Sequence, residues 1–337
     1  MKATVFGKPY DLHLVERPRP NPPRGEALVE VAAAGVCAGD VYIYVGTHPY
    51  VTYPRVGGHE IAGRVIALGP DTDGPPIGTD VAVEPFIGCG RCYACRVGKS
   101  NCCANLQIIG VHRDGGFADY LLAPVDRLHV VPEGLSPFAA SFAEPVAIGV
   151  QACRRGTVAA GDKVLVLGAG PIGLAILEVA KARGAKVFIT DINPQRLQTA
   201  AELGATTIAA GEGLLDEVLR LTDGEGMPVV MEATGSPPVA ESTVDLVASG
   251  GRVVIVGILK NGVRVGFPGL DLVRKEMTIV GSRASVGCFP ESLGLLASGA
   301  IRYPEIATRF SLDQALSVFE RIVSGEPLHK AVFVEAA

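Results

Sequence analysis

A glycine pattern that directly follows an apolar segment constrains the fold of this chain most strongly. Lys163–Leu167 runs into Gly168-Ala-Gly-Pro-Ile-Gly173, and Leu174–Arg183 follows with a helix-forming composition. A second apolar segment, Lys186–Thr190, then ends at Asp191. The glycine pattern alone is weak evidence, but a strand before it, a helix after it and an acidic residue about 20 positions later form a dinucleotide-binding arrangement. The segment therefore predicts a parallel βαβ unit that can hold a pyrophosphate.

The parts of this segment have separate roles in the prediction. Gly168 permits a tight turn, Gly170 lets the pyrophosphate approach the backbone, and Gly173 lets the helix pack closely on the strand. Pro171 and Ile172 lie within the glycine pattern, and the helix expected at Leu174–Arg183 directs unpaired N–H groups and its positive dipole end at the phosphates. The alternative is that the glycines serve an ordinary turn between a strand and a helix and bind no ligand.

Asp191 indicates which dinucleotide fits. Its carboxylate is expected to accept hydrogen bonds from the adenosine ribose hydroxyls, and its charge repels a 2′-phosphate. Ile192, the next residue, brings no cation, so the sequence favours NAD over NADP. Arg196, five residues after Asp191, is the nearby cation that argues for NADP. The nicotinamide is expected near Gly257, in a cleft between two domains.

Length and composition bound the remaining possibilities. A chain of 337 residues fits about two domains of ordinary size. Its apolar fraction of 48% and charged fraction of 19% are typical of a globular protein, and no apolar stretch reaches the roughly 20 residues of a membrane span. A net charge of −5 without a basic run argues against nucleic acid as a partner. We therefore expect a soluble, cytoplasmic protein that binds neither membranes nor nucleic acids.

The spacing of the apolar segments changes near Ala159. Before it, short strands separated by turns are predicted at residues 2–6, 26–32, 60–68, 80–84 and 120–123, which indicates an antiparallel β domain. After it, predicted strands alternate with helix-length segments, and they lie at residues 163–167, 186–190, 207–209, 229–232, 252–256 and 277–280. That alternation is typical of a doubly wound parallel sheet with helices on both faces. The predicted fold class is therefore α/β with two domains.

Four closely spaced cysteines form a separate feature, Cys89, Cys92, Cys95 and Cys103, with the spacing C-x2-C-x2-C-x7-C. Four thiolates so close together suit a tetrahedral structural zinc, and disulfides or an iron–sulfur cluster are the alternatives. No secretory segment opens the chain and the other cysteines are scattered, which disfavours disulfides. Cys102 adjoins Cys103, and only one of the two can easily complete the tetrahedron.

Isolated metal-capable residues occur at three further places, namely Cys37, the pair His59-Glu60, and Glu144. Each stands among small or apolar residues, where an unpaired imidazole or carboxylate is costly to bury. A zinc ion with one open position, held by a thiolate, an imidazole and one or two carboxylates, would remove that cost and make a catalytic site. A buried thiol, a core histidine and a glutamate at a helix start explain the same residues separately.

Taken together, these motifs resemble the zinc-dependent medium-chain dehydrogenases. The resemblance runs in order along nearly the whole chain, through the Cys37 segment, Gly58-His59-Glu60, the four-cysteine lobe at residues 88–104, Asp114–Tyr120, Glu144-Pro145, Gly168–Gly173 and Gly281–Arg283. Glu144-Pro145 resembles the sorbitol and threonine dehydrogenase branch. Tyr53–Glu60, Asn101–Cys103 and Ile109–Phe117 are similar to a sugar-acid branch typified by L-galactonate and L-gulonate 5-dehydrogenases.

The resemblance implies a fold and an assembly. It implies a GroES-like catalytic β domain at residues 1–147, a Rossmann domain at 148–283, and a tail at 284–337 that returns to the catalytic domain. It also implies a homotetramer or homodimer whose Rossmann sheets pair edge to edge around Gly266–Val273. In this family the last cysteine of the lobe lies five residues after a glycine, as Cys103 does after Gly98, so Cys103 is the implied fourth ligand and Cys102 a spectator.

The implied chemistry needs two zinc ions per chain and NAD. Cys37, His59 and Glu144 would hold the catalytic zinc, with Glu60 either as a ligand or as the residue that orients water. Zinc makes a bound alcohol more acidic, so that it gives up hydride to nicotinamide. The family usually has serine or threonine two residues after the zinc-binding cysteine as a proton relay, but this chain has Gly39. The candidates for the substrate pocket are Tyr42, His48, Arg113, Arg283 and Phe289.

The leading hypothesis is a zinc- and NAD-dependent dehydrogenase that oxidises a secondary alcohol of a polyol or sugar acid. A dehydrogenase of L-threonine, sorbitol or simple alcohols on the same scaffold is a second hypothesis. A third is a redox sensor that binds NAD, keeps only the structural zinc and catalyses nothing. Zinc-free quinone reductases share the fold but give no reason for Cys37, His59 and the four-cysteine lobe together.

Overall fold

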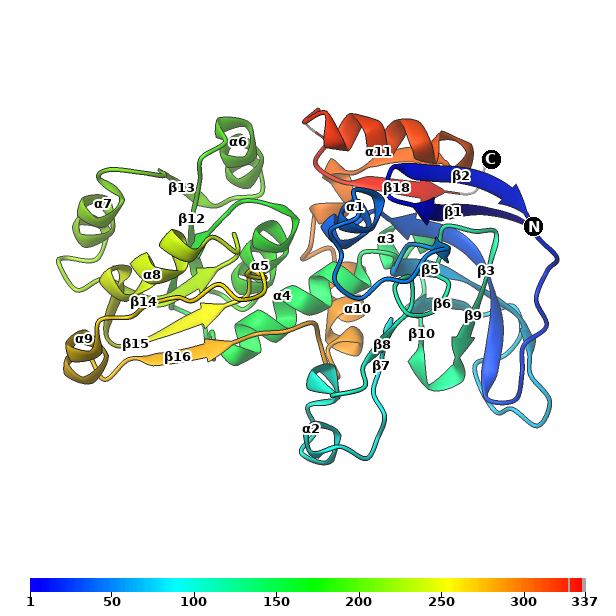
Figure 1. Ribbon diagram of the computed structural model, residues 1–337. Helices are drawn as coiled ribbons and strands as arrows, with labels where there is room; N and C mark the ends of the chain where they lie inside the picture. The colour runs from blue at the N-terminus through cyan, green and yellow to red at the C-terminus, as the bar shows by residue number, and fades with distance from the viewer. Residues whose placement is uncertain (327, 335–337) are drawn as a thin grey trace. The chain divides into compact units, whose positions relative to one another are not determined.

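The computed structural model describes residues 1–326 and 328–334, and its chain divides into two compact units. Unit 1 comprises Met1–Glu144, Phe289–Gly299 and the chain from Pro304 onward, and unit 2 comprises Pro145–Cys288 and Ala300–Tyr303. Figure 1 labels the helices and strands of both units. The chain therefore returns to unit 1 at Phe289, passes once more through unit 2 at Ala300–Tyr303, and continues in unit 1 from Pro304.

Unit 1 is built mainly from antiparallel strands. Its larger sheet has the order β10-β6-β5-β3-β18-β17 with β9 also paired to β3, and a smaller sheet has the order β2-β1-β4 (Figure 1). β18 pairs antiparallel with β3 and parallel with β17, so the last described strand lies beside one from the N-terminal part of the chain. The strands are β1 Lys2–Lys8, β2 Asp11–Glu16, β3 Glu26–Gly35, β4 Arg55–Val56, β5 Glu60–Leu68, β6 Asp80–Val83, β9 Tyr120–Pro124, β10 Leu128–Val130, β17 Thr308–Ser311 and β18 Ala331–Val334.

Short helices and a small lobe complete unit 1. The helices are α1 Ala38–Tyr44, α3 Pro137–Ala140, α10 Phe289–Ala297 and α11 Ala315–Val323, with 3-10 turns at Val125–Arg127 and Leu312–Gln314. A further 3-10 turn, Tyr303–Ile306, begins at the last residue of unit 2 and continues in unit 1. The lobe consists of the pair β7 Phe86–Ile87 and β8 Gln107–Ile108, the short helix α2 Tyr93–Arg96 and a 3-10 turn at Ser100–Cys102. The lobe has little apolar core of its own, since α2 has no buried residue.

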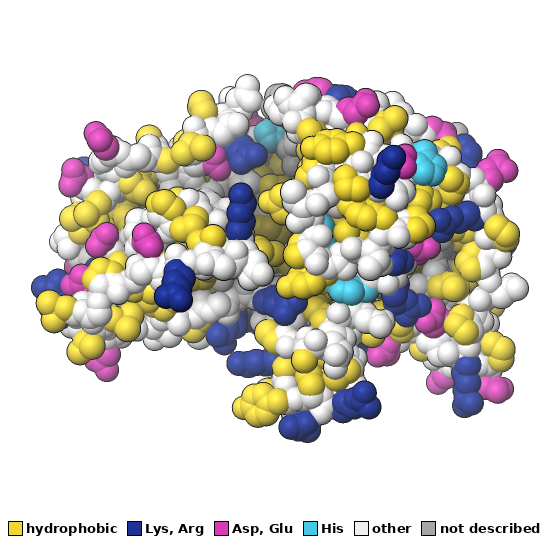
Figure 2. All heavy atoms as spheres, viewed as in Figure 1, with side chains coloured by type: hydrophobic (Ala, Val, Ile, Leu, Met, Phe, Trp, Pro, Cys, Tyr) yellow, Lys and Arg dark blue, Asp and Glu magenta, His cyan; other side chains and the backbone are white. Residues whose placement is uncertain are grey.

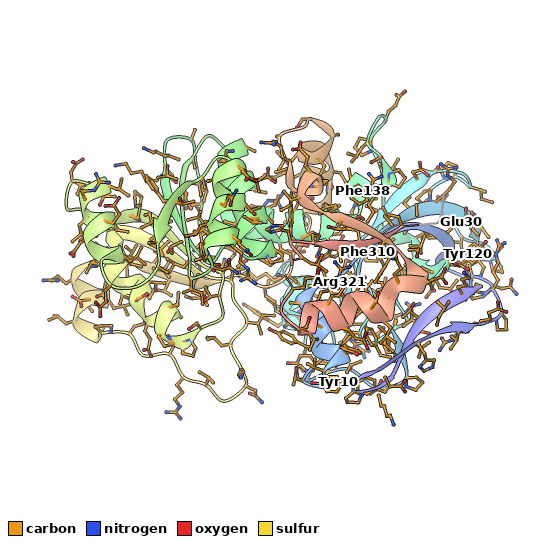
Figure 3. The ribbon with its side chains drawn as sticks, turned by 90° about the horizontal axis from the view of Figure 1, so that it is seen from above. Tyr10, Glu30, Tyr120, Phe138, Phe310 and Arg321 are labelled. Atoms are coloured by element: carbon orange, nitrogen blue, oxygen red, sulfur yellow. The ribbon has the colours of Figure 1, made fainter. Side chains whose placement is uncertain are left out.

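Aromatic side chains from distant parts of the sequence fill the core of unit 1. Phe319 on α11 packs edge-on against Phe117, with ring centroids 6.2 Å apart, and Phe117 meets Phe333 of β18 edge-on at 5.1 Å. Arg321, also on α11, lies over the Phe310 ring at 5.4 Å, and Figure 3 shows the two side chains beside this helix. These contacts hold the C-terminal helix and strand on the N-terminal part of the unit, because buried aromatic rings remove much apolar area from water.

Unit 2 is a parallel sheet in the order β13-β12-β11-β14-β15-β16. Its strands are β11 Lys163–Leu167, β12 Lys186–Asp191, β13 Thr206–Ala209, β14 Met227–Glu232, β15 Val247–Ile255 and β16 Thr278–Gly281. The helices are α5 Pro171–Ala182, α6 Pro194–Glu202, α7 Leu214–Leu221, α8 Pro237–Leu246 and α9 Gly269–Arg274, and α4 Ala143–Arg155 begins at the boundary of the units. β11 is buried at all positions except its first, as expected for a central strand covered on both faces. The predicted doubly wound sheet is confirmed.

The observed strands agree with the sequence pattern where that pattern is regular. The strands predicted at residues 60–68 and 163–167 coincide with β5 and β11. β15 differs, since it begins at Val247 and passes through Gly250, whose φ of +74° and neighbouring Gly251 are typical of a turn. Among residues 1–326 and 328–334, no helix has the length and apolar composition needed to cross a membrane.

Candidate functional site

Three of the predicted zinc ligands meet in unit 1. Cys37 follows β3 and caps the N-terminus of α1, while His59 and Glu60 stand at the start of β5. Because β3 and β5 pair antiparallel, with Gly35 opposite Glu60, these two chain segments are brought together. One potential ligand atom from each of Cys37, His59 and Glu60 lies within 4.8 Å of the others, and this group is called the three-residue cluster below.

Asp40, on α1, hydrogen-bonds the two chain segments that carry this cluster. No sequence motif indicated this role. Its buried carboxylate accepts hydrogen bonds from the backbone N–H of Cys37 at 2.9 Å and of Gly58 at 3.0 Å. Asp40 Oδ1 also lies 3.8 Å from His59 Nδ1. Burial raises the pKa of Asp40, against the lowering effect of His59. Asp40 therefore ties together the two chain segments that carry the cluster.

Lys330 is a second functional residue that the sequence analysis missed. Its buried ammonium group donates hydrogen bonds to Glu60 Oε1 at 2.5 Å and to the Val36 carbonyl at 2.9 Å. Burial lowers the pKa of Lys330, but the negative charges of Glu60 and Cys37 raise it by more, so the net shift of the pKa is upward. The Glu60 carboxylate is thus held by a buried cation immediately before β18.

Glu144 interacts electrostatically with His59 and Glu60 but is not one of the three members of the cluster. It is buried at the start of α4, and burial raises its pKa to about 7, with Glu60 adding to the rise and His59 opposing it. Burial lowers the pKa of His59, yet Asp40, Cys37 and Glu144 raise it well above 6.5.

The donor set of this site fits a zinc ion. A thiol, an imidazole and the Glu60 carboxylate converge, and Glu144 interacts electrostatically with His59 and Glu60. Among the described residues, Lys330 is the ammonium group paired with Glu60. His59 Nδ1 is buried without a hydrogen-bond partner among the described residues. Nitrogen, sulfur and oxygen donors of these types are the usual protein ligands of zinc, and a cation compensates buried negative charge.

The four predicted lobe cysteines also come together. Their sulfur atoms lie within 4.8 Å of one another, and the separations Cys92–Cys95 and Cys92–Cys103 are 3.5 and 3.8 Å. Cys103 is buried and its sulfur accepts hydrogen bonds from two backbone N–H groups, of Cys89 at 3.2 Å and Asn105 at 3.3 Å. Backbone hydrogen bonds lower the pKa of Cys92 to about 6, which favours the thiolate. Cys102 is exposed and stands outside this group.

The glycine pattern in unit 2 forms an open turn at the end of β11. Gly168 has a φ of +104°, and a side chain at Gly173 would overlap the Gly168 carbonyl oxygen. Gly170 caps the N-terminus of α5, where Pro171 is the first helical residue. A side chain at Gly170 would meet nothing within 4 Å, so the space above this turn is open to a ligand.

Asp191 fixes the neighbouring end of β12. Its Oδ2 accepts a hydrogen bond from the Ala169 N–H at 2.8 Å, and its Oδ1 accepts one from the Asn193 N–H at 2.8 Å. Arg196 Nη1 lies 3.9 Å from Asp191 Oδ2, and its side chain is half exposed. Ile192 is 92% exposed beside this carboxylate. The remaining predicted residue, Gly257, packs so tightly that a side chain there would overlap the Gly235 backbone.

The predicted substrate residues lie in several places. His48 belongs to a ring cluster in unit 1, in which Tyr50 contacts His48 edge-on at 6.1 Å and stacks on His112 at 6.3 Å. Burial lowers the pKa of His48, and the charges of His59 and His112 lower it further. Tyr42 is 53% exposed on α1. Tyr50 and His112 carried no sequence signal, because stacking joins separate loops.

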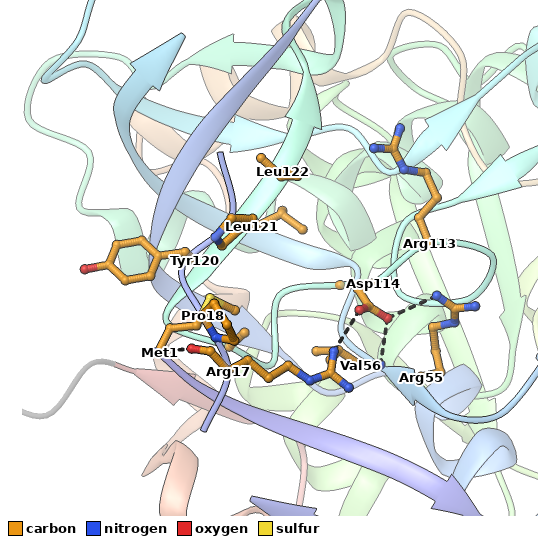
Figure 4. A pocket seen from close by; sticks show the side chains of 13 residues that line it. Met1, Arg17, Pro18, Arg55, Val56, Arg113, Asp114, Tyr120, Leu121 and Leu122 are labelled. Carbon is orange, nitrogen blue, oxygen red and sulfur yellow. Dashed lines mark hydrogen bonds and ion pairs between the residues drawn. The ribbon is translucent and has the colours of Figure 1, made fainter. Parts of the chain in front are cut away.

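The other three substrate candidates are Arg113 and Phe289 in unit 1 and Arg283 in unit 2. Arg113 lines a surface pocket with Arg17, Arg55 and Asp114 (Figure 4). Asp114 bridges the other two arginines, with a distance of 3.0 Å to Arg17 and 3.0 Å to Arg55. Arg113 itself pairs with Glu26 at 2.6 Å. In unit 1 Phe289 is buried and stacks on His129 at 4.9 Å, while in unit 2 Arg283 is exposed.

Comparisons with known proteins define the class. Two family profiles match the chain, an alcohol dehydrogenase GroES-like domain at residues 23–133 and a zinc-binding dehydrogenase at residues 171–298. The chain belongs to the zinc-type medium-chain alcohol dehydrogenases, which confirms the predicted family, enzyme class and two-domain fold.

Particular relatives cover nearly all of the chain. It is 36% identical to the L-galactonate-5-dehydrogenase of Escherichia coli (strain K12), over 98% of each chain. The structure of an alcohol dehydrogenase (rspB) from E. coli CFT073, complexed with NADH, is 32% identical with a TM-score of 0.92. A putative zinc-binding dehydrogenase from Sinorhizobium meliloti 1021, bound to NADP, is 30% identical with a TM-score of 0.91. Each structural match covers 99% of both chains.

Proposed function

We propose that this enzyme oxidises a secondary alcohol of a polyol or sugar acid and passes the hydride to NAD. The three-residue cluster of Cys37, His59 and Glu60 carries the proposal, because it offers zinc a mixed donor set at a buried site. The similarity to an L-galactonate-5-dehydrogenase supports a sugar acid as the substrate. Asp191 at the end of β12 supports NAD as the cofactor, since its carboxylate disfavours a 2′-phosphate.

Cys37, His59 and a carboxylate from Glu60 or Glu144 would hold the catalytic zinc, and Cys89, Cys92, Cys95 and Cys103 the structural one. When bound at an open site, zinc acts as a Lewis acid that makes an alcohol hydroxyl easier to ionise. Asp40 fixes the Cys37 backbone at 2.9 Å and places a carboxylate 3.8 Å from His59 Nδ1. Lys330 restrains the Glu60 side chain by a hydrogen bond to Oε1 of its carboxylate. Gly39 supplies no hydroxyl, so we assign proton release to the ring cluster of His48 or to Tyr42.

A substrate panel tests the reaction. NAD reduction is measured with hexonates, polyols, L-threonine and simple alcohols, on protein whose zinc content is known from metal analysis. We expect about two zinc ions per chain and the highest kcat/KM for a hexonate or polyol. Preference for L-threonine or a simple alcohol would support the second hypothesis. One tightly held zinc without turnover on any of these substrates would support the non-catalytic redox sensor.

A pair of arginine variants tests whether the substrate is an anion. We propose Arg283 as the cation that receives its carboxylate and compare it with Arg113, which pairs with Glu26 at 2.6 Å. Arg283→Ala should raise KM for a hexonate but not for a neutral polyol, and Arg113→Ala is the matched control that should leave both unchanged. Equal KM values for the hexonate in wild type and Arg283→Ala would remove Arg283 from the site.

We also propose that the enzyme assembles as a homodimer or homotetramer through residues 266–273. Leu270 and Val273 on α9 are 77% and 79% exposed, and Leu272 is 41% exposed. Figure 2 shows hydrophobic side chains at the surface over this helix. Neighbouring exposed apolar side chains of this size support a surface that a second subunit covers.

A further inference from the structure

Glu232 is a buried carboxylate that has no part in the function described above. It is the last residue of β14, and its side chain is 0% exposed. The strand order of the sheet changes direction between β11 and β14, and in such sheets ligands bind outside the carboxyl ends of the strands at this switch point. Because a buried carboxylate is costly unless donors compensate it, the partners of Glu232 indicate its role.

One carboxylate oxygen organises the turn that follows β14. Glu232 Oε1 accepts hydrogen bonds from the backbone N–H groups of Thr234 at 2.6 Å and Gly235 at 2.9 Å, and from the Thr234 hydroxyl. The same turn lies against the first glycine of the dinucleotide pattern, since a side chain at Gly168 would come within 2.8 Å of Thr234 Cγ2. Glu232 thus fixes the turn 233–235 beside the expected pyrophosphate site.

The second carboxylate oxygen occupies the space beside the end of β15. A side chain at Gly257 would lie 2.6 Å from Glu232 Oε2, and the N–H of Gly257 donates to the Glu232 carbonyl at 3.0 Å. Gly235, with a φ of +69°, packs closely on Ile258, the residue after Gly257. A side chain at Gly235 would lie 2.7 Å from the Ile258 carbonyl oxygen. Glu232 therefore connects the end of β14, its turn and the end of β15.

The side chains held in this way are exposed to solvent. Thr234 is exposed, and Ile258 is 92% exposed although isoleucine is usually buried. Ile192, after the end of β12, is equally exposed, and among the large hydrophobic side chains of the described residues these two isoleucines are the most exposed. Both follow the carboxyl ends of parallel strands, where an apolar side chain can pack against the flat face of a bound base.

We propose that Glu232 is a positioning residue for the nicotinamide half of the dinucleotide. Its carboxylate sets the places of Thr234 and Ile258, which form the surface that receives the nicotinamide nucleoside. Asp191 and Ile192 serve the adenosine half, on the other side of the switch point. The inference rests on the proposed function, because it takes the dinucleotide site of unit 2 as given.

Two ligands separate the two halves of the site. NADH contains both nucleosides, whereas ADP contains only the adenosine half and the pyrophosphate. Dissociation constants for both are measured by calorimetry on wild type and Glu232→Gln, with melting temperatures recorded in parallel. We expect Glu232→Gln to weaken NADH about tenfold and to leave ADP within about twofold. Ile258→Ser should show the same selective loss, and Ile192→Ser should weaken both ligands.

Glu178→Gln is the matched control. Glu178 is a buried carboxylate of unit 2 that also fixes backbone, accepting hydrogen bonds from the N–H groups of Arg302 and Tyr303 at 2.7 Å each. It lies in the middle of α5 rather than at a strand end. We expect this variant to melt at a lower temperature but to bind NADH and ADP as wild type does.

The outcomes distinguish the inference from the proposed function. Wild-type NADH affinity in Glu232→Gln, or equal losses for NADH and ADP, would overturn the role of Glu232. If Glu232→Gln does not fold, Thr234→Val and Ile258→Ser supply the same readout, and unchanged NADH affinity in both would overturn it as well. A wild-type protein that binds neither ligand would instead overturn the proposed NAD dependence.

Discussion

Within residues 1–326 and 328–334, Lys330 is the side chain whose charge is paired with the buried carboxylate of Glu60. In Lys330→Met that carboxylate would lose its cation, and removing one partner of a buried ion pair costs about 3–5 kcal/mol. We expect this loss in the free energy of unfolding, measured with urea on zinc-loaded protein. Lys330→Arg should lose less, because it keeps a cation.

The double variant Glu60→Gln/Lys330→Met provides the control for this prediction. It removes both charges, so it should recover most of the stability that Lys330→Met loses. A double variant as unstable as Lys330→Met would mean that packing of the lysine, and not its charge, stabilises the site.

Asp191 should control the choice between NAD and NADP. Asp191→Asn keeps an acceptor for one of the two backbone N–H groups at 2.8 Å but loses the charge that repels a 2′-phosphate. We expect the ratio of kcat/KM for NAD to that for NADP to fall about tenfold. Arg196→Ala removes the nearby cation and should move the ratio in the opposite direction. A shift of the same sign in both variants would contradict this account.

The sequence predicted the candidate metal ligands better than the residues that hold those ligands in place. Cys37, His59 and Glu60 stand in recognisable motifs, and the structure places them together. Asp40 had a weak signal, since it follows Cys37 by three residues and can bond the backbone of its own turn. Lys330 had none, because its partner Glu60 is 270 residues away and only the pairing of β18 with β3 brings them together.

The turn between β11 and α5 makes a prediction that separates folding from binding. At Gly170 an alanine side chain would meet nothing within 4 Å, and the backbone φ of −73° suits alanine. Gly170→Ala should therefore keep the wild-type melting temperature while its Kd for NADH rises about tenfold, because the methyl group stands where the pyrophosphate approaches.

Gly173→Ala is the contrasting variant in the same turn. Its side chain would overlap the Gly168 carbonyl oxygen, so both the melting temperature and the NADH affinity should fall. A stable Gly173→Ala protein, or full NADH affinity in Gly170→Ala, would show that this turn is not arranged around a phosphate.

The four-cysteine lobe makes a prediction about metal content. Cys103 is buried among the other three sulfurs, whereas Cys102 is exposed. Cys103→Ser should lose one zinc per chain and become sensitive to proteases between β7 and β8, because the lobe has little apolar core and metal binding supplies its folding energy. Cys102→Ser should keep the wild-type zinc content. Loss of zinc in Cys102→Ser alone would exchange the two roles.

The strands with a regular apolar pattern could be predicted from the sequence, whereas the short strands could not. β5 and β11 follow periodic or continuous apolar segments, so their existence and bounds could be read from the sequence. β17 and β18 have only four residues each, and their positions depend on pairing with each other and with β3. These strands form because of tertiary contacts, which a local sequence pattern does not contain.

The whole molecule raises the question of assembly. Replacing Leu270 and Val273 by glutamate places charge on the exposed apolar side chains of α9. We expect this double variant to have a smaller mass than wild type by light scattering, since buried charges without partners disrupt an interface. Leu316→Glu, also at an exposed apolar position but on α11, is the control that should leave the mass unchanged. A wild-type monomer would contradict the proposed assembly outright.

The position of β18 beside β3 gives synthesis of this enzyme an order in time. Cys37, His59 and Glu60 leave the ribosome early, but Lys330, which compensates Glu60, follows 270 residues later. The four lobe cysteines lie within one short segment and need no such distant partner. The lobe can therefore take up zinc on the growing chain while the other site still lacks its cation.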